Sequence, residues 1–139
     1  MYLKANKFFV NLRKRLAFLE FQMVKVEVDK IVVVLVYRSP SFGNVDKFLQ
    51  SLVGLVEDER GPLIICGDFN IDPLAERTKY DSLQAAMSSF DMVNIMTRPT
   101  HLGGNKLDHV WMSRKLELKY SDLHHPYYSD HDATLVIVE

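Results

Sequence analysis

The sequence has 139 residues, of which 47% are hydrophobic and 25% are charged. This composition is typical of one globular domain and excludes an intrinsically disordered chain. The formal net charge of -1 provides no general attraction to a polyanion. The segment before Glu20, the first acidic residue, is basic, and it is either a solvated surface or an arm that lies near nucleic acid.

A single cysteine, Cys66, excludes an internal disulfide framework. The longest apolar run, Ile31 to Val36, is too short to cross a bilayer, and no apolar secretory core follows the N-terminal charges. We therefore expect a soluble, intracellular protein that has no membrane partner.

Three strands are predicted first along the chain. Residues 1–20 mix helical and extended patterns, and we interpret them as a strand plus a loop. Residues 21–29 alternate between apolar and polar side chains, which predicts a half-buried strand. Residues 31–36 form a continuous β-branched run, which is typical of a strand buried on both faces. Pro40 and Gly43 then interrupt the pattern.

A helix follows, because Asn44 is a favourable N-cap and apolar residues recur with a 3.6-residue period from Val45 to Val56. Leu63 to Cys66 is a second buried strand. A second helix is predicted around 79–89, and short strands are predicted near 91–95, 106–112 and 133–138. Strand, helix and strand followed by shorter strands predict a layered α/β domain with a mixed sheet.

Polar residues gather where the apolar runs end. Asp68 and Asn70 follow the second buried strand, and ligands of α/β sheets bind beyond the carboxyl ends of strands. Two residues apart on an extended chain, the two side chains can point the same way, so that one acts as a base or metal ligand and the other binds a phosphate oxygen. The alternative, a simple Asp/Asn turn that closes a strand, has about equal weight.

Two further acid and histidine pairs occur later in the chain. Asp108 and His109 lie in an apolar strand, where a carboxylate is costly unless it is paired. Asp130 and His131 precede the last strand, where an acid beside an imidazole suits metal binding and phosphate chemistry. Either pair could also be a plain surface feature. The remaining histidines are not spaced as a zinc cluster, so the hard ions Mg²⁺ or Mn²⁺ are expected instead.

The ordered set of motifs resembles the endonuclease/exonuclease/phosphatase (deoxyribonuclease I-like) superfamily. The residues of these motifs are most similar to those in the endonuclease domains of non-LTR, LINE-type retrotransposons. The similar segments are Tyr37-Arg38-Ser39-Pro40-Ser41, Gly67 to Asp72, Pro99 to Val110 and Tyr128 to Ala133. The resemblance implies an α/β fold that is the C-terminal part of a four-layer sandwich, with a mixed sheet and flanking helices.

The resemblance also implies substrate-binding and catalytic roles for individual residues. Asp68 would position or deprotonate the attacking water, and Asn70 would hydrogen-bond the phosphate. Tyr37 would contact the scissile phosphate from the end of its strand. Arg38 and Thr100 would contribute to substrate binding at the edge of the site.

The remaining implied roles concern the metal and the histidine. Asp108 would orient His131, which would stabilise the pentacovalent phosphate, and Asp130 would help to bind Mg²⁺ or Mn²⁺. The family also places a metal-ligating Glu and a phosphate-facing Asn in its first strands, and neither Glu20 nor Glu27 has that context. We therefore expect residues 1–139 to form one partial domain that lacks those N-terminal strands.

Three functions follow as hypotheses. The first is a Mg²⁺-dependent phosphodiesterase that nicks DNA, which makes DNA the partner and the nucleus a fitting compartment. The second is a catalytically incomplete, transposon-derived fragment or interaction module. The third, which has less support, is a phosphatase of the phosphoinositide type.

Overall fold

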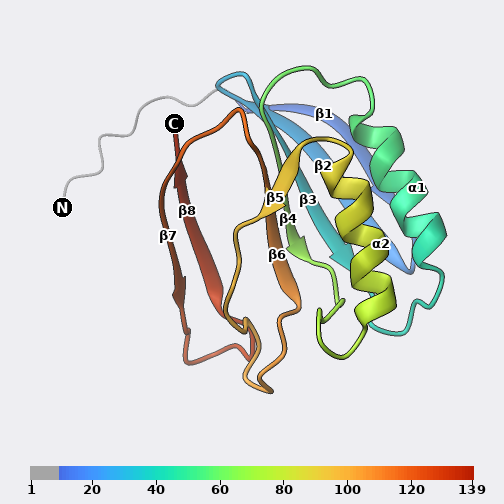
Figure 1. Cartoon of the computed structure of the whole chain (residues 1–139), viewed down its shortest axis with the longest axis vertical. Helices are drawn as coiled ribbons and strands as arrows, with labels where there is room; N and C mark the ends of the chain where they lie inside the picture. Colours follow the sequence, from blue (N-terminus) through green and yellow to red (C-terminus); the bar gives the residue numbers. More distant parts are fainter. Residues whose placement is uncertain (1–9) are drawn as a thin grey trace.

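The structure is a computed structural model that describes residues 10–139. These residues form a six-stranded sheet, a two-stranded sheet and two helices (Figure 1). The strands of the larger sheet are β1 (Val10–Ala17), β2 (Phe21–Val28), β3 (Ile31–Arg38), β4 (Leu63–Asp68), β5 (Met92–Asn94) and β6 (Asp108–Ser113). The smaller sheet consists of β7 (Leu118–His124) and β8 (Ala133–Val138), and the helices are α1 (Val45–Val56) and α2 (Arg77–Ser88).

The larger sheet is mixed, with the order β1-β2-β3-β4-β6-β5. Strands β3 and β4 are parallel, and the other four pairings are antiparallel. Helix α1 connects the two parallel strands, because a parallel pair requires a crossover rather than a tight hairpin. The predicted α/β class and mixed sheet are confirmed.

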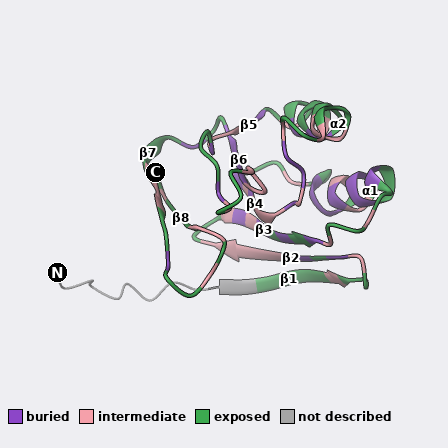
Figure 2. Cartoon of the chain, turned by 90° about the horizontal axis from the view of Figure 1, so that it is seen from below, coloured by how far each residue is buried: buried purple, intermediate pink, exposed green. Residues whose placement is uncertain are grey.

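The elements stack in three layers. Figure 2 shows the six-stranded sheet edge-on, with α1 and α2 along one side and β7 and β8 on the other. One helical layer and one full sheet are thus followed by a small second sheet. This arrangement fits the predicted part of a four-layer sandwich.

The core lies between the helices and the larger sheet. The side chain of Asn44 accepts a hydrogen bond of 3.0 Å from the amide of Lys47 and caps α1. The apolar stripe of α1 then packs on the sheet, and Phe48 makes edge-to-face contacts with Phe21 and Phe69 at centroid distances of 5.7 and 5.9 Å. Complete burial of each such side chain is worth about 1.5–3 kcal/mol. This packing fixes the strands whose ends carry the polar residues.

The N-terminal expectation is borne out in part, because β1 is a strand and is followed by a bend before β2. Lys4 and Lys7 of the basic segment lie outside the described residues, whereas Arg13 forms an ion pair with Glu27 at 3.3 Å. Strand β7 was not predicted, because its polar and largely exposed residues give no apolar signal. Across residues 10–139, none of the helices has the length and apolarity that a membrane span requires.

Candidate active site at one edge of the sheet

Three of the predicted site residues lie in one row across the larger sheet. Tyr37 at the end of β3 is the register partner of Asp68 on β4, and Asp68 is the register partner of Asp108 on β6. Register partners on neighbouring strands project from the same face. The fold therefore places a phenol and two carboxylates side by side, although they are distant in the sequence.

The backbone around Asp68 is shaped by Gly67 and Asn70. Gly67 has φ +138°, and a Cβ atom there would lie 2.0 Å from the carbonyl oxygen of Val36, so only glycine permits this approach of β4 to β3. Asn70 has φ +48°, its amide donates to Asp68 Oδ1 at 3.0 Å, and its Nδ2 donates to the carbonyl of Arg38 at 2.7 Å. The prediction of an extended chain from Asp68 to Asn70 is wrong, because the strand ends at Asp68 and a turn follows.

Two loops pair with each other next to this edge and carry the last site residues. The amide of Leu102 donates to the carbonyl of Asp130 at 2.9 Å, and the amide of Asp132 donates to the carbonyl of Thr100 at 2.8 Å. His101 and His131 form the bridge between these two bonds. This pairing brings the start of β8 to the start of β6.

The imidazole of His131 consequently lies between two carboxylates. Its Nδ1 is 2.8 Å from Asp108 Oδ2, and its Nε2 is 3.9 Å from Asp68 Oδ2. In the neutral ring, Nδ1–H donates to Asp108, and the ring orientation is fixed by that bond. The structure therefore brings Asp108 and His131 together as the resemblance implied.

Asp130 lies on the solvent side of the histidine, where its Oδ2 is 3.2 Å from His101 Nε2. Two groups of potential metal ligands occur within the described residues, and each has its ligand atoms within 4.8 Å of one another. One group is Asp68, Asp108 and His131, and the other is His101, Asp130 and His131. Carboxylates that converge with an imidazole fit a hard divalent cation.

Charge and burial alter the ionisation of both ends of this arrangement. Burial raises the pKa of Asp68, and the nearby charge of Asp108 raises it further, although hydrogen bonds from Asn70 and the His131 charge oppose the shift. Burial alone would lower the pKa of His131, but the hydrogen bond and charge of Asp108, together with the charges of Asp68 and Asp130, raise it overall. The pKa of Asp130 is lowered, chiefly by the hydrogen bond from His101. The site thus favours a more basic Asp68 and a protonated His131.

Arg38 does not contact the site as expected. Its side chain is completely buried, and the guanidinium donates to the carbonyls of Phe69 and Asn70, at 3.2 and 3.0 Å, and to that of Phe42. These bonds tie the loop after β4 to the end of β3. The predicted substrate contact of Arg38 is corrected to a structural role, because no part of the side chain reaches solvent.

Thr100 is also buried rather than exposed in the site. Its Oγ1 accepts hydrogen bonds from the amides of Leu107 and Asp108, at 3.1 and 2.9 Å. The substrate contact predicted for Thr100 is therefore corrected: the hydroxyl holds the backbone that carries Asp108.

His109 is buried as well, donates from Nε2 to the carbonyl of Ile71 at 2.9 Å, and has a pKa lowered by burial to about 4.

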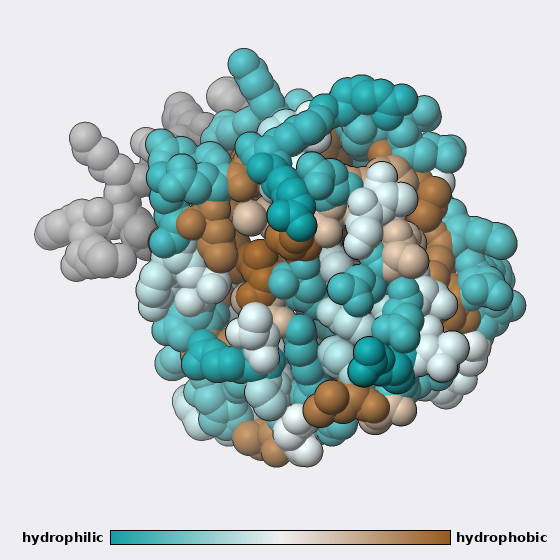
Figure 3. Space-filling view, viewed as in Figure 1, coloured by the Kyte–Doolittle hydropathy of each residue, from teal (hydrophilic) through white to brown (hydrophobic). Residues whose placement is uncertain are grey.

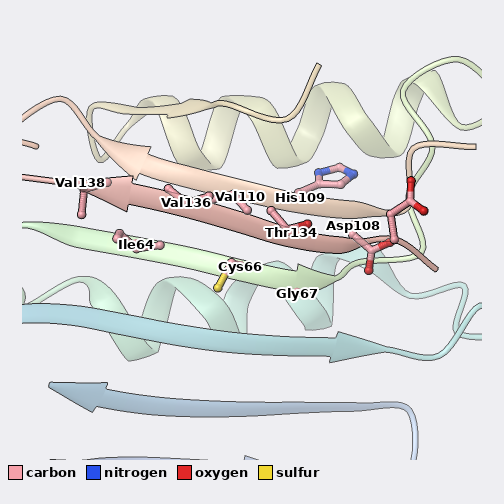
Figure 4. A pocket seen from close by; sticks show the side chains of 10 residues that line it. Ile64, Cys66, Gly67, Asp108, His109, Val110, Thr134, Val136 and Val138 are labelled. Carbon is pink, nitrogen blue, oxygen red and sulfur yellow. The ribbon is translucent and has the colours of Figure 1, made fainter. Parts of the chain in front are cut away.

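A cleft of about 410 Å³ separates the larger sheet from β8 and runs up to the site. Figure 4 shows Asp108 at one end, while the interior is apolar. The apolar lining residues are Ile64, Cys66, Val110, Val136 and Val138. In the space-filling view, apolar atoms reach the surface between otherwise polar regions (Figure 3). The polar site therefore adjoins an apolar channel between the two sheets.

The comparison with known families decides the assignment. A profile of the endonuclease/exonuclease/phosphatase family matches residues 10–131, a range that includes all of the site residues from Tyr37 to His131. The chain belongs to this family. Its members share the fold described above, and the predicted family is confirmed.

Solved structures support the family fold. The endonuclease domain of TRAS1, a telomere-specific non-LTR retrotransposon, is similar over 95% of this chain with a TM-score of 0.71 and 14% identity. The catalytic domain of human Nocturnin is similar over 92% with a TM-score of 0.61 and 18% identity. A mannosyl-6-phosphatase from Bacteroides thetaiotaomicron is similar over 86% with a TM-score of 0.56 and 14% identity. These TM-scores show a shared fold, and at identities of 14–18% the likeness leaves the substrate open.

The chain spans 67% of the TRAS1 domain, 60% of the Nocturnin domain and 56% of the phosphatase. No curated protein matches the sequence. One contact was missed from the sequence: His101 was set aside because its spacing did not fit a zinc cluster, yet it lies against Asp130 and His131. Only its place in the Pro99 to Val110 segment could have indicated this.

Proposed function

We propose that this chain forms the phosphate-cleaving part of a Mg²⁺- or Mn²⁺-dependent DNA endonuclease. The observation that carries the proposal is the position of His131, which is held by Asp108 at 2.8 Å and faces Asp68 at 3.9 Å. A carboxylate, an oriented imidazole and a second carboxylate at one edge provide a base, a cationic donor and an orienting group for phosphodiester hydrolysis.

In the proposed reaction, a water molecule attacks phosphorus and the bond to the 3′ oxygen breaks, which leaves a 3′ hydroxyl and a 5′ phosphate. Asp68 orients the water and accepts its proton, a role for which its raised pKa is suited. The protonated His131 donates a hydrogen bond to a phosphate oxygen as negative charge increases in the transition state. Tyr37, which is 46% exposed beside Asp68, would contact another phosphate oxygen. Asn70 would do the same with the Nδ2 hydrogen that its bond to the Arg38 carbonyl leaves free.

The metal would be held by Asp130, because this exposed carboxylate lies beside His101 and His131 and has an oxygen to spare. When bound, a divalent cation supplies positive charge that stabilises the phosphorane-like transition state. The proposed partners are thus DNA and one hard cation, and a nuclear site of action is part of the same proposal.

DNA is favoured over a small phosphate ester by two observations. Four segments between Tyr37 and Ala133 resemble retrotransposon endonucleases in their order and in their residues. The TRAS1 endonuclease domain also superposes with a TM-score of 0.71, against 0.56 for the mannosyl phosphatase.

Nicking of supercoiled plasmid with Mg²⁺ or Mn²⁺ tests the proposal. We expect nicking by the folded chain, and loss of nicking in Asp68→Asn and His131→Ala. Matched controls are Asp58→Asn and His124→Ala, whose side chains are exposed and make none of the hydrogen bonds of the site. Absence of metal-dependent nicking by a folded, monodisperse sample would refute the proposal, and hydrolysis of inositol phosphates instead would support the phosphoinositide alternative.

A second candidate is a catalytically incomplete fragment that acts by binding a partner. The apolar cleft beside β8 favours it. It predicts strong binding of an apolar dye and weak binding of Mg²⁺. Tight, stoichiometric Mg²⁺ binding in isothermal titration would count against it.

A further inference from the structure

We propose that His101 is a positioning residue that holds the carboxylate of Asp130 for a divalent cation. The inference rests on the proposed function only in placing the cation at Asp130. It adds a residue to the site that the motif resemblance did not identify.

The hydrogen bonds of His101 fix its tautomer. The amide of Gly103 donates to His101 Nδ1 at 3.0 Å, so Nδ1 must present a lone pair. The proton of the neutral ring is therefore on Nε2, which lies 3.2 Å from Asp130 Oδ2 and donates to it. The ring bridges a backbone amide and a carboxylate, and both of its nitrogens are used.

The same tautomer argues against His101 as a metal ligand. His101, Asp130 and His131 have ligand atoms within 4.8 Å of one another, a grouping that could hold a transition metal. Ligation through Nε2 would require the proton to move to Nδ1, where it would oppose the amide hydrogen of Gly103. The group is therefore better described as a hydrogen-bonded support for Asp130 than as a second metal site.

Asp130 needs such a support because its side chain is 67% exposed and precedes β8 in a loop. His101 is only 25% exposed. Its ring packs edge-to-face on that of His131, with centroids 5.0 Å apart. Backbone bonds fasten the loop of His101 to the loop of Asp130 on both sides of this contact. The imidazole of His101 thus restrains the carboxylate of Asp130, which would otherwise rotate freely. Asp130 Oδ1 remains available for the cation.

Gly103 makes the arrangement possible. A Cβ atom at this position would lie 3.1 Å from His101 Nδ1 and 3.2 Å from Asn105 Oδ1. A side chain there would press against the ring atom that fixes the tautomer. The position therefore offers a second way to disturb His101 without removing its imidazole.

The test measures Mn²⁺ affinity of the whole chain by electron paramagnetic resonance, with no substrate present. Partners that orient a metal ligand are worth roughly 10- to 100-fold in metal affinity. We expect His101→Phe, which keeps a ring but has no N–H, to weaken Mn²⁺ binding about tenfold. His101→Gln, whose amide can donate from a position similar to that of Nε2, should retain most of the affinity. His124→Phe is the matched control and should bind Mn²⁺ as the unmodified chain does.

Two further variants keep the test decisive. Asp130→Asn must weaken Mn²⁺ binding, since the proposal places the ion there. If His101→Phe does not fold, Gly103→Ala replaces it and should weaken binding by a smaller factor.

Several results would overturn the inference. These are equal Mn²⁺ affinity in His101→Phe and the unmodified chain, equal loss in the Phe and Gln variants, or no Mn²⁺ binding by the unmodified chain. Failure of the proposed function is distinguishable, because the chain would then bind Mn²⁺ at Asp130, with an affinity that depends on His101, without nicking plasmid.

Discussion

The ion pair between Asp108 and His131 predicts a pH-dependent contribution to stability that can be measured without substrate. Asp108→Asn keeps the shape and a possible hydrogen bond but removes the charge. The two side chains are 19% and 31% exposed and their atoms are 2.8 Å apart. A charge-assisted hydrogen bond of this kind contributes about 1.5 kcal/mol, the lower end of its range, because solvent screens part of the interaction.

The sign of the pH dependence follows from the shift of His131. Its pKa is raised in the folded state, so the folded chain binds the proton more tightly than the unfolded chain does. The contribution is complete below the unfolded value of about 6.5 and is lost as pH rises through the raised folded pKa. At high pH the variant also loses the repulsion between Asp108 and Asp68, which favours the variant slightly.

Urea unfolding at pH 6 and pH 9 checks this prediction. At pH 6, Asp108→Asn should be less stable by about 1.5 kcal/mol, which corresponds to a melting temperature lower by roughly 4–8 °C for a chain of this size. At pH 9 the difference should vanish or reverse. Asp58→Asn, an exposed control, should show no difference at either pH. An equal loss at both pH values would refute the ion-pair explanation.

Three other predictions concern buried groups. Arg38→Met should lower the free energy of unfolding by about 3 kcal/mol, because it leaves backbone carbonyls without donors, and an unchanged urea midpoint would contradict the structural role. The folded pKa of His109 is about 4, so the free energy of unfolding should decrease by roughly 3 kcal/mol as pH falls from 6.5 to 4. His109→Gln should reduce this decrease in acid unfolding curves. Burial raises the pKa of the Cys66 thiol to about 11. Iodoacetamide should therefore label the native chain at pH 8 about 100-fold more slowly than the urea-unfolded chain. Similar labelling rates would show that the cleft is open to solvent.

The sequence predicted the fold well where apolar periodicity is strong. The β-branched run of β3 and the capped stripe of α1 have patterns that only one secondary structure satisfies. Strand β7 escaped prediction because a two-stranded sheet with one apolar side leaves most of its residues polar. Periodicity reports burial, and β7 is hardly buried.

For the site, residue types at strand ends were a good guide and side-chain directions were not. Asp68 and Asp108 belong to strands whose register sets them side by side, and the motif order anticipated this. Arg38 and Thr100 occur in the same motifs, yet both point inward and bond to backbone. A motif marks a segment of chain, whereas the face to which each side chain turns depends on tertiary contacts that the sequence does not display.

Gly67 and Asn70 illustrate a further limit. Their positive φ angles turn the chain immediately around Asp68, and the resulting hydrogen bond to Asp68 Oδ1 comes from a backbone amide. Glycine and asparagine are the residues that tolerate such angles. The sequence allowed a turn here as one of two alternatives, but it did not indicate that the Asn70 amide would donate to the Asp68 carboxylate.

The cleft between the two sheets has a mechanical consequence. Asp68 and Asp108 belong to the larger sheet, whereas His131 directly precedes β8 of the smaller one. The hydrogen bond that orients the imidazole therefore links the two sheets across the mouth of the cleft. Any molecule or substitution that increases or decreases the distance between the two sheets will change the distance between His131 and Asp68. The position of the His131 ring therefore reports the relative position of the two sheets, even when no phosphate is bound.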